Sequence, residues 1–336
     1  MKKRVITMLM VLILLGTSAL IGCGTDSTED SISTTTEESR EELEAEESMA
    51  YEPITIDNYG KEITITQKPE RVVTLGPNCT ELFVALGLSD LIIGTSLNNH
   101  SRGALPEYKE IYDAIPELTH SEVTREAIMT SGADFIYGID WEFGGEAFDD
   151  TDLEASGIVA YMNAATTMEE IYQEITDLGK IFEIEDVAEA FIAEQKARIQ
   201  AVEEIVSAQA GPIKVLVYDS GSEGIFTCSG INFETLLIEY AGGKNIFDDM
   251  TERQWITVSY EEVLAREPDV ILIHDYDAPS VEEKIAEIKA NPTLATLDCV
   301  KNERFAVISL ASVLPGNRMA FAIESLARDF YPEAFE

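Results

Sequence analysis

Alternation of apolar and polar residues predicts a β-hairpin that begins near residue 54. Isoleucines alternate with polar residues on both sides of a turn sequence at 58–60. A buried strand is expected at 71–75, followed by a turn and a helix that Asn78 could cap. Further strands are expected at 91–95, 135–139 and 158–162, separated by helical segments. This order of elements is typical of an α/β lobe with a mostly parallel sheet.

A long helix is predicted between two such lobes. The segment 187–208 contains neither Gly nor Pro, and Ile192, Ile199, Val202 and Val206 fall on one helical face. At 1.5 Å per residue this segment would span about 33 Å, which is long for a crossover within one sheet. We therefore predict the fold class α/β, with two Rossmann-like lobes of mostly parallel sheet joined by a single long α-helix. The expected boundaries are 51–186 for the first lobe, 187–210 for the helix and 211–336 for the second lobe.

A weak internal repeat supports two related lobes. Residues 126–136 align with residues 261–271, and each segment reads as Glu, a short amphipathic helix, an Asp eight residues on and a buried strand. Thr124 and Ser259 precede the two Glu residues as candidate N-caps, and Glu262 would complete a capping box with Ser259. Two similar units could also arise by coincidence from ordinary α/β architecture.

The N-terminal segment has the features of a bacterial export signal. A basic segment at 2–4 is followed by an apolar run at 5–15, which is short for a membrane span. The tetrad 20–23 resembles the lipobox, in which the cysteine becomes the lipidated first residue of the mature protein. We expect a lipoprotein signal peptide at 1–22 and lipidation of Cys23; the alternative is an ordinary cleaved signal. Residues 23–50 are acidic and rich in Ser and Thr, and are expected to be a disordered tether on the outer side of the cell membrane.

Composition and charge exclude several classes of partner. The 336 residues carry a formal charge of −40 at pH 7, and 45% of them are hydrophobic, enough for two packed cores. A nucleic-acid-binding protein needs a basic surface, as does a protein that docks on anionic lipid through charge. We therefore expect no nucleic-acid partner, and membrane attachment only through the lipid anchor.

Known catalytic and cofactor motifs are absent from the sequence. There is no P-loop, GxGxxG, HExxH or CxxC motif, and residues 219–224 do not form a hydrolase nucleophile elbow. We therefore expect no enzyme and no resident cofactor, although an exported hydrolase stays the alternative. The histidines leave a direct zinc or manganese site open. The internal cysteines could form a disulfide or stay as buried thiols. These residues are His100, His120 and His274, and Cys79, Cys228 and Cys299.

The loops that follow strands are the expected ligand-binding surface. Ligands of open α/β sheets bind beyond the carboxyl ends of the strands, so two lobes that face each other would form a cleft there. Aromatic residues in such loops suit a flat or bulky ligand, and each could instead pack on its own lobe. The candidate ligand-binding residues are Asn98, His100, Arg102, Trp141, Phe143, Trp255, Tyr276 and Arg318.

Five segments of the chain carry a resemblance to a known family: 69–81, 85–87, 126–136, 242–247 and 259–271. Through these segments, the chain from residue 54 to the C-terminus resembles the substrate-binding lipoproteins of ABC importers for iron–siderophore, haem and cobalamin. The resemblance implies a monomer that captures a metal chelate and delivers it to an ABC permease dimer with its ATPase subunits. It also implies that acidic residues on the lobe surfaces dock onto basic permease residues, and these fall here on Glu126 and Glu261.

The charge of the chain narrows the expected ligand. The loops of the predicted cleft contain only Arg102, Arg253 and Arg318 as Arg or Lys residues, so a neutral or cationic chelate is easier to accommodate than a trianion. We expect an iron–siderophore of the hydroxamate type or a corrinoid. Haem stays open, because His100, His274 or Tyr276 could act as an axial ligand.

Overall fold

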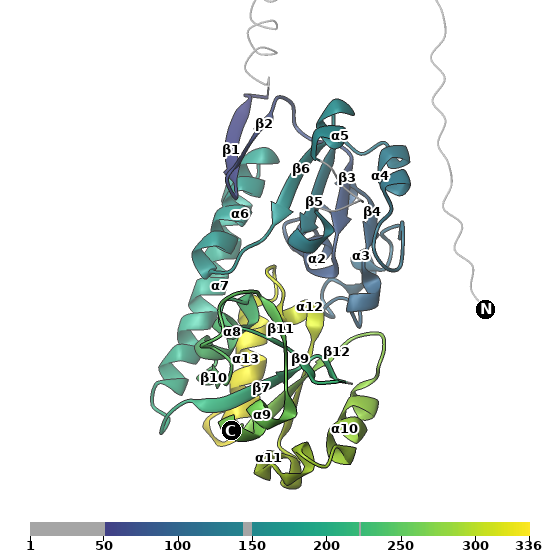
Figure 1. Cartoon of the computed structure of the whole chain (residues 1–336). Coiled ribbons are helices and arrows are strands. Elements are labelled where there is room, and N and C mark those ends of the chain that lie inside the picture. The colour runs from purple at the N-terminus through teal and green to yellow at the C-terminus, as the bar shows by residue number, and fades with distance from the viewer. Residues whose placement is uncertain (1–50, 144–149, 222) are drawn as a thin grey trace, which may run out of the picture. The chain divides into compact units, whose positions relative to one another are not determined.

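The computed structural model describes residues 51–143, 150–221 and 223–336, and they form one compact unit. The expected signal peptide, Cys23 and the acidic tether lie outside these residues. Within them, no helix is both long and apolar enough to cross a membrane. Figure 1 shows the described part as two α/β lobes with one long helix, α7, running along both. We call residues 51–181 the N-terminal lobe and residues 213–336 the C-terminal lobe.

The N-terminal lobe is built on a four-stranded parallel sheet with the strand order β4-β3-β5-β6. The predicted hairpin is confirmed, because Ile54 pairs with Ile65 and Ile56 with Ile63 in an antiparallel register. The strands are β1 (Ile54–Asn58), β2 (Lys61–Ile65), β3 (Val72–Leu75), β4 (Ile92–Ser96), β5 (Phe135–Ile139) and β6 (Val159–Asn163). The helices are α2 (Pro77–Ala85), α3 (Lys109–Tyr112), α4 (Arg125–Ser131), α5 (Asp150–Ala155) and α6 (Met168–Ile181).

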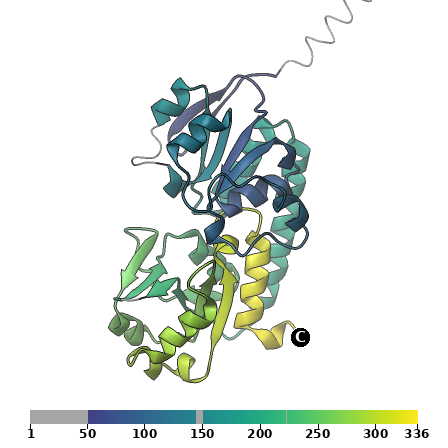
Figure 2. The same cartoon turned by 90° about the vertical axis from the view of Figure 1, so that its right-hand side faces the viewer.

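The long helix α7 (Glu185–Val206) has 22 residues and begins two residues before the predicted start. It packs against α6 of the N-terminal lobe and against α13 (Met319–Phe330) of the C-terminal lobe. Gly179 permits the close approach to α6, because a Cβ at this position would lie 2.9 Å from the Ala188 Cβ. Figures 1 and 2 both show α7 running along the same side of the two lobes.

The C-terminal lobe repeats the parallel sheet with the order β10-β7-β12-β13 and adds a small antiparallel sheet, β11-β9-β8. Its strands are β7 (Ile213–Tyr218), β8 (Ser220–Gly221), β9 (Ile225–Cys228), β10 (Gly243–Asn245), β11 (Trp255–Val258), β12 (Val270–Asp275) and β13 (Phe305–Ser309). Its other helices are α8 (Phe233–Tyr240), α9 (Tyr260–Arg266), α10 (Val281–Ala290), α11 (Asp298–Lys301) and α12 (Leu310–Val313). Within the four-stranded sheet of each lobe, all strands run parallel to one another, as the order of elements predicts.

Two details differ from the sequence-based expectation. Asn78 does not cap α2: the helix begins at Pro77, and Gly76, with φ of +118°, precedes it. The sequence analysis names no strand in residues 220–228, but Ile225–Cys228 pairs with Trp255–Val258, and Ser220–Gly221 pairs with Ile225 and Phe226. Short strands that alternate only over four residues give little periodic signal, which is why this small sheet is not evident from the sequence.

The internal repeat has a structural counterpart. In each sheet the repeated segment supplies the third strand, β5 in one lobe and β12 in the other, together with the short helix before it. Thr124 caps α4 by accepting a hydrogen bond from Ala127 N, and Ser259 forms the expected capping box with Glu262. The cap, the helix and the strand therefore occupy equivalent places in the two lobes.

Candidate ligand-binding cleft

The cleft lies where strand ends of the two lobes face each other. Loops after β5 and β6 supply its N-terminal wall, while β11, α8 and the segment before α13 supply its C-terminal wall. The space between the walls has a volume of about 20 Å³, room for about one water molecule. The lobes therefore already touch across the cleft. The residues that line this space are Ile139, Asp140, Trp141, Asn163, Ala164, Ala165, Asn232, Phe233, Gln254, Trp255, Val313, Leu314 and Pro315.

Aromatic side chains from both lobes gather at the cleft. Trp141 is 41% exposed, and its ring centroid lies 6.3 Å from that of His100. The His100 ring is in turn stacked 6.5 Å from Tyr276 of the C-terminal lobe. Trp255 stacks on Phe226 at 5.4 Å in the small antiparallel sheet. The structure thus brings together Trp141, His100 and Tyr276 from the predicted set, and adds Phe226, which the sequence analysis did not identify.

His100 is the histidine whose environment suits ligand contact. Burial lowers its pKa from the usual value, so its ring is neutral at pH 7. The Nδ1 atom lies 3.0 Å from the Asn99 side-chain oxygen, which orients the ring. A neutral imidazole keeps one nitrogen lone pair, and this is the group that ligates a metal centre.

His274 has a different environment, because it is fully buried between two carboxylates. Its Nδ1 lies 3.0 Å from Asp219 Oδ1 and its Nε2 lies 2.9 Å from Glu234 Oε1. Burial alone would lower its pKa, but Glu234 and Asp219 outweigh burial and raise the pKa to about 9. The ring is therefore an imidazolium with both nitrogens engaged, and it has no lone pair for a metal.

This buried charge centre supports Tyr276 at the cleft. The Tyr276 hydroxyl donates to Asp219 Oδ2 at 3.1 Å. The Nζ atom of buried Lys284 lies 3.7 Å from the centre of the Tyr276 ring and donates to the His274 carbonyl at 2.8 Å. Burial lowers the pKa of Lys284 to about 8. The position of Tyr276 is thus fixed by Lys284, which lies against the face of its ring, and by Asp219, which accepts from its hydroxyl.

Two charged pairs close the rim of the cleft. Arg102 Nε donates to Asp275 Oδ1 at 2.8 Å, and His120 Nε2 lies 3.0 Å from Asp277 Oδ2. The backbone N–H of Asp277 also donates to the Asn99 carbonyl at 3.2 Å. We call these three contacts the rim latch. The predicted ligand residue Arg102 is therefore bound to the opposite lobe in this conformation.

A buried ion pair joins the lobes deeper in the molecule. Arg318 donates from Nε and Nη2 to the two carboxylate oxygens of Glu81, and Asn317 Nδ2 donates to Glu81 Oε1 at 2.8 Å. Arg318 is 3% exposed and Glu81 is completely buried. The charge of Arg318 is thus balanced within the protein, whereas the sequence analysis expected it to orient a ligand. Its contact with a ligand stays a prediction, and its partner Glu81 was not foreseen.

The remaining predicted residues lie at the edges of the cleft. Asn98 donates to Glu117 Oε2 at 2.7 Å and accepts from the Tyr112 hydroxyl at 2.8 Å, so it holds its own loop in place. Phe143 is half-buried and packs against the core of the N-terminal lobe, and its contact with a ligand stays a prediction. Gln254 reaches across the cleft to Asp140 at 3.4 Å.

The cysteines and histidines form no metal centre among the residues that the structure describes. Cys79, Cys228 and Cys299 are all free and buried, which supports the buried-thiol alternative over a disulfide. Burial raises the pKa of each thiol, so the cysteines are protonated and act as small apolar side chains.

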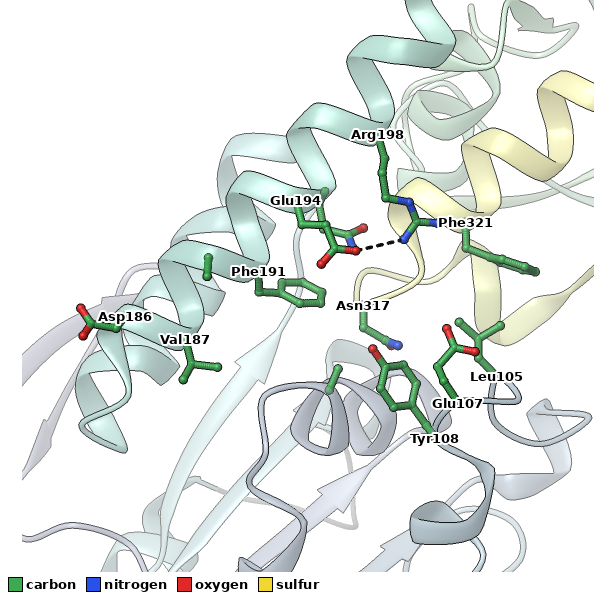
Figure 3. Close-up of a pocket in the computed structure, with 13 residues that line it drawn as sticks. Leu105, Glu107, Tyr108, Asp186, Val187, Phe191, Glu194, Arg198, Asn317 and Phe321 are labelled. Carbon is green, nitrogen blue, oxygen red and sulfur yellow. Dashed lines mark ion pairs between the residues drawn. The ribbon is translucent and has the colours of Figure 1, made fainter. Parts of the chain in front are cut away.

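A larger hollow of about 480 Å³ lies beside α7 (Figure 3). Phe191 and Val187 of α7, Phe321 of α13 and Tyr108 of the N-terminal lobe line it. Glu194 and Arg198, which form an ion pair along α7 at 3.7 Å, also line it. It contains none of the predicted ligand-contact residues. We interpret this hollow as space along the connecting helix and assign ligand binding to the aromatic cleft.

Glu126 and Glu261 are exposed, each at the second position of its short helix. They occupy equivalent places in the two lobes because each follows its N-cap by two residues. This arrangement presents one carboxylate on each lobe, as the resemblance implies.

Known proteins match the chain along most of its length. Residues 72–310 match the sequence family described as periplasmic binding protein. An uncharacterized ABC transporter substrate-binding lipoprotein, YvrC of Bacillus subtilis, is 23% identical over the full length of both chains. A vitamin B12-binding protein of Vibrio campbellii is 27% identical over 60% of this chain and 70% of its own length.

Solved structures agree on the fold. A periplasmic binding protein from Veillonella parvula has a TM-score of 0.74 at 24% identity, with 83% of this chain and 98% of that chain covered. A protein of an ABC-type Fe3+-hydroxamate transport system from Saccharomonospora viridis has a TM-score of 0.71 at 23% identity, with 83% and 99% covered. From its two α/β lobes, its connecting helix and its match over residues 72–310, the chain belongs to the periplasmic binding protein family.

Proposed function

We propose that this protein is the extracytoplasmic substrate-binding lipoprotein of an ABC importer, and that it captures a metal chelate of the iron–siderophore type between its lobes. The observation that carries the proposal is the cleft between two parallel-sheet lobes, with Trp141 and Trp255 facing the same space. An aromatic wall supplies a large contact area for a bulky, rigid ligand. Two of the similar proteins described above are named for a ligand, one for vitamin B12 and one for Fe3+-hydroxamate. Both of these ligands are metal chelates.

The charges of the cleft favour a neutral or cationic chelate. Arg102 is paired with Asp275 and Arg318 with Glu81, so two of the three arginines in the predicted cleft loops are already balanced, and Arg253 is the third. Asp140 lines the same space, and burial raises the pKa of its carboxyl. A polyanionic catecholate complex would meet carboxylates with only Arg253 left to offset its charge. A ferric hydroxamate complex avoids this cost.

A corrinoid is the second candidate. The vitamin B12-binding relative aligns over 60% of this chain, and the two tryptophans at the cleft suit a large planar ring. The neutral ring of His100 could complete the coordination of a cobalt or iron centre, which also keeps haem among the candidates.

Delivery to a permease is the part of the proposal that separates an importer component from other binding proteins. One exposed carboxylate on each lobe, Glu126 and Glu261, would face basic residues on a permease with two equivalent halves. Charged contacts at the rim of an interface chiefly steer encounter and fix orientation. We propose a lipid anchor at Cys23 that keeps the protein at the outer face of the membrane, beside a permease with its ATPase subunits.

Charge reversal tests the delivery step. The variants Glu126→Arg and Glu261→Arg should strongly reduce uptake of a ferric hydroxamate by cells, while the purified variants keep the ligand affinity of the wild type. The matched control is Glu110→Arg, which reverses an exposed charge on α3. Normal uptake by the double variant Glu126→Arg/Glu261→Arg would exclude the docking role.

A further inference from the structure

Each lobe carries an exposed apolar side chain one helical turn after its exposed glutamate. In α4, Met129 follows Glu126 by three residues, and in α9, Leu264 follows Glu261 by three residues. Met129 is 37% exposed and Leu264 is 40% exposed. Residues three apart lie on the same face of a helix, so each lobe presents a carboxylate and an apolar side chain together.

The two carboxylate–apolar pairs are held in equivalent positions. Each repeat contains an aspartate eight residues after its glutamate, and the side chain of this aspartate accepts a backbone hydrogen bond at the start of a neighbouring strand. Asp134 accepts from Arg71 N at 3.0 Å, just before β3, and Asp269 accepts from Lys214 N at 2.8 Å, in β7. Because β3 and β7 hold the same place in their sheets, each helix is fixed to its sheet in the same way.

Single exposed apolar residues are common and need no explanation. Exposed apolar residues that recur at matched positions in two lobes do call for one. The core does not require them, since Ile128 and Val263 are the buried residues of these helices. A partner with one binding site could use only one pair. A partner made of two equivalent halves could use both pairs, since a symmetric dimer offers the same site twice.

We propose that Met129 and Leu264 are apolar anchors for the two halves of the permease, each seated beside the basic residue that pairs with the neighbouring glutamate. This inference rests on the proposed function. The carboxylates steer the encounter, while burial of the two apolar side chains slows dissociation. A partner site of this kind combines an Arg or Lys with an adjacent apolar pocket, as is usual at the centre of protein interfaces.

The test measures binding of the full-length chain to the ABC permease–ATPase complex of the same organism, held in lipid nanodiscs, by biolayer interferometry. Met129→Ser and Leu264→Ser should each weaken binding about tenfold, mainly through faster dissociation, and the double variant should weaken it further. The controls are Ile111→Ser and Val307→Thr, which change exposed apolar residues on α3 and β13 and should leave binding unchanged. The melting temperature should be the same as in the wild type for each of the four single variants.

The outcomes separate this inference from the proposed function. If the wild type binds no such complex, the proposed function fails. If the wild type binds and Glu126→Arg/Glu261→Arg abolishes binding, but Met129→Ser/Leu264→Ser binds as the wild type does, then only the apolar anchors are refuted. Equal weakening by the control variants would also overturn the inference, because it would show a non-specific effect of surface polarity.

Discussion

At the residue scale, His274 shows how a polar side chain can stabilise the wall of a cleft. Its imidazolium is buried between Asp219 and Glu234, and Asp219 in turn accepts from Tyr276 at the cleft. A buried charge is stable only when it is paired and hydrogen-bonded, and both ring nitrogens meet this condition. Removal of one member would leave an uncompensated charge in the core.

The His274 cluster predicts a loss of stability on the alkaline side. The folded pKa of His274, about 9, is above the usual value of 6.5. The group therefore contributes stability that is fully present below pH 6.5 and is lost as the pH rises through about 9. We expect the free energy of unfolding, measured in urea, to fall between pH 6.5 and pH 9.

The control for this prediction is the variant His274→Gln, which cannot titrate in that range. It should be less stable than the wild type by about 3–5 kcal/mol at pH 6.5, because it leaves buried carboxylates unpaired. The free energy of unfolding of this variant should also change much less with pH than that of the wild type. A wild type whose stability is unchanged from pH 6.5 to pH 9 would contradict a buried imidazolium.

Trp141 and Arg318 are predicted to respond differently to truncation. Trp141→Ala removes a half-exposed ring and should weaken binding of a ferric hydroxamate with little change in melting temperature. Arg318→Ala leaves Glu81 buried without its cation and should cost about 3–5 kcal/mol of stability. Differential scanning calorimetry combined with ligand titration distinguishes the two effects. An Arg318→Ala protein of normal stability and reduced affinity would instead place this residue at the ligand.

Buried charged residues were the largest omission of the sequence analysis, although the sequence contains a signal for two of them. Glu81 lies in the segment Thr80–Phe83, and Glu234 follows Phe233, so each interrupts an apolar helix. A carboxylate on a buried helical face needs a partner. The partners, Arg318 and His274, are far away in sequence, and only the packing of the lobes identifies them.

At the element scale, α7 connects the lobes through side-chain contacts as well as through the chain. Gln195 is buried on α7, and its Oε1 accepts a hydrogen bond from Ala320 N at 3.0 Å. Ala320 lies in the first turn of α13, where backbone N–H groups have no partner within the helix. A side chain from α7 thus caps a helix of the C-terminal lobe.

This cap predicts a specific cost. Gln195→Leu would leave the buried Ala320 N–H without an acceptor, and we expect a loss of about 1–3 kcal/mol in the free energy of unfolding. The matched control is Gln200→Leu, because Gln200 lies on the same helix but is exposed. Equal stability of the two variants in chemical denaturation would show that the contact with α13 contributes nothing.

Helices and long strands were predictable, and short strands were not. The period of apolar residues identifies α7 to within two residues and both parallel sheets, because these elements bury continuous faces. The strand β9 pairs with β8 on one side and with β11 on the other, and β11 comes from a more distant segment of the chain. As a result, Phe226 and its stacking with Trp255 could not be predicted.

The cleft could be predicted as a location, but its closed state could not. Parallel strands direct their following loops to one edge, which brings Trp141 and Tyr276 to the cleft. Contacts across the rim depend on the relative position of two lobes, which has no signature in a single sequence. The pairing of Arg102 with Asp275 is therefore a finding of the structure.

At the scale of the whole molecule, the rim latch competes with ligand entry. The space inside the cleft holds about one water molecule, so a chelate can enter only after Arg102–Asp275 and His120–Asp277 separate. A closed state that cannot bind reduces the apparent affinity by the fraction of open molecules. Weakening the latch should therefore favour binding.

The latch predicts a gain of function. Asp277→Asn should speed association of a ferric hydroxamate by no more than about fivefold, since exposed ion pairs contribute little. Stopped-flow fluorescence measures this rate. The control is Asp113→Asn, which removes an ion pair with Lys109 inside the N-terminal lobe. Slower association in Asp277→Asn would contradict a latch and indicate that Asp277 contacts the ligand.

The same latch should respond to pH. The hydrogen bond that His120 donates to Asp277 raises the pKa of His120, and Glu117 adds to this effect. The charged pair is therefore complete below pH 6.5 and is lost as the pH rises through the folded pKa. Association with a neutral chelate should become faster over this range in the wild type and stay constant in Asp277→Asn. A wild-type rate that does not change would exclude a role for His120 in closure.

The most direct test of the whole account is a tryptophan fluorescence titration, because both tryptophans of the chain line the cleft. The purified protein is titrated with a neutral ferric hydroxamate, cobalamin, haem and an anionic ferric catecholate. The account predicts saturable quenching with one equivalent of a neutral or cationic chelate, ferric hydroxamate first, and none with the catecholate. Absence of quenching by all four ligands, or tight binding of the catecholate alone, would contradict it.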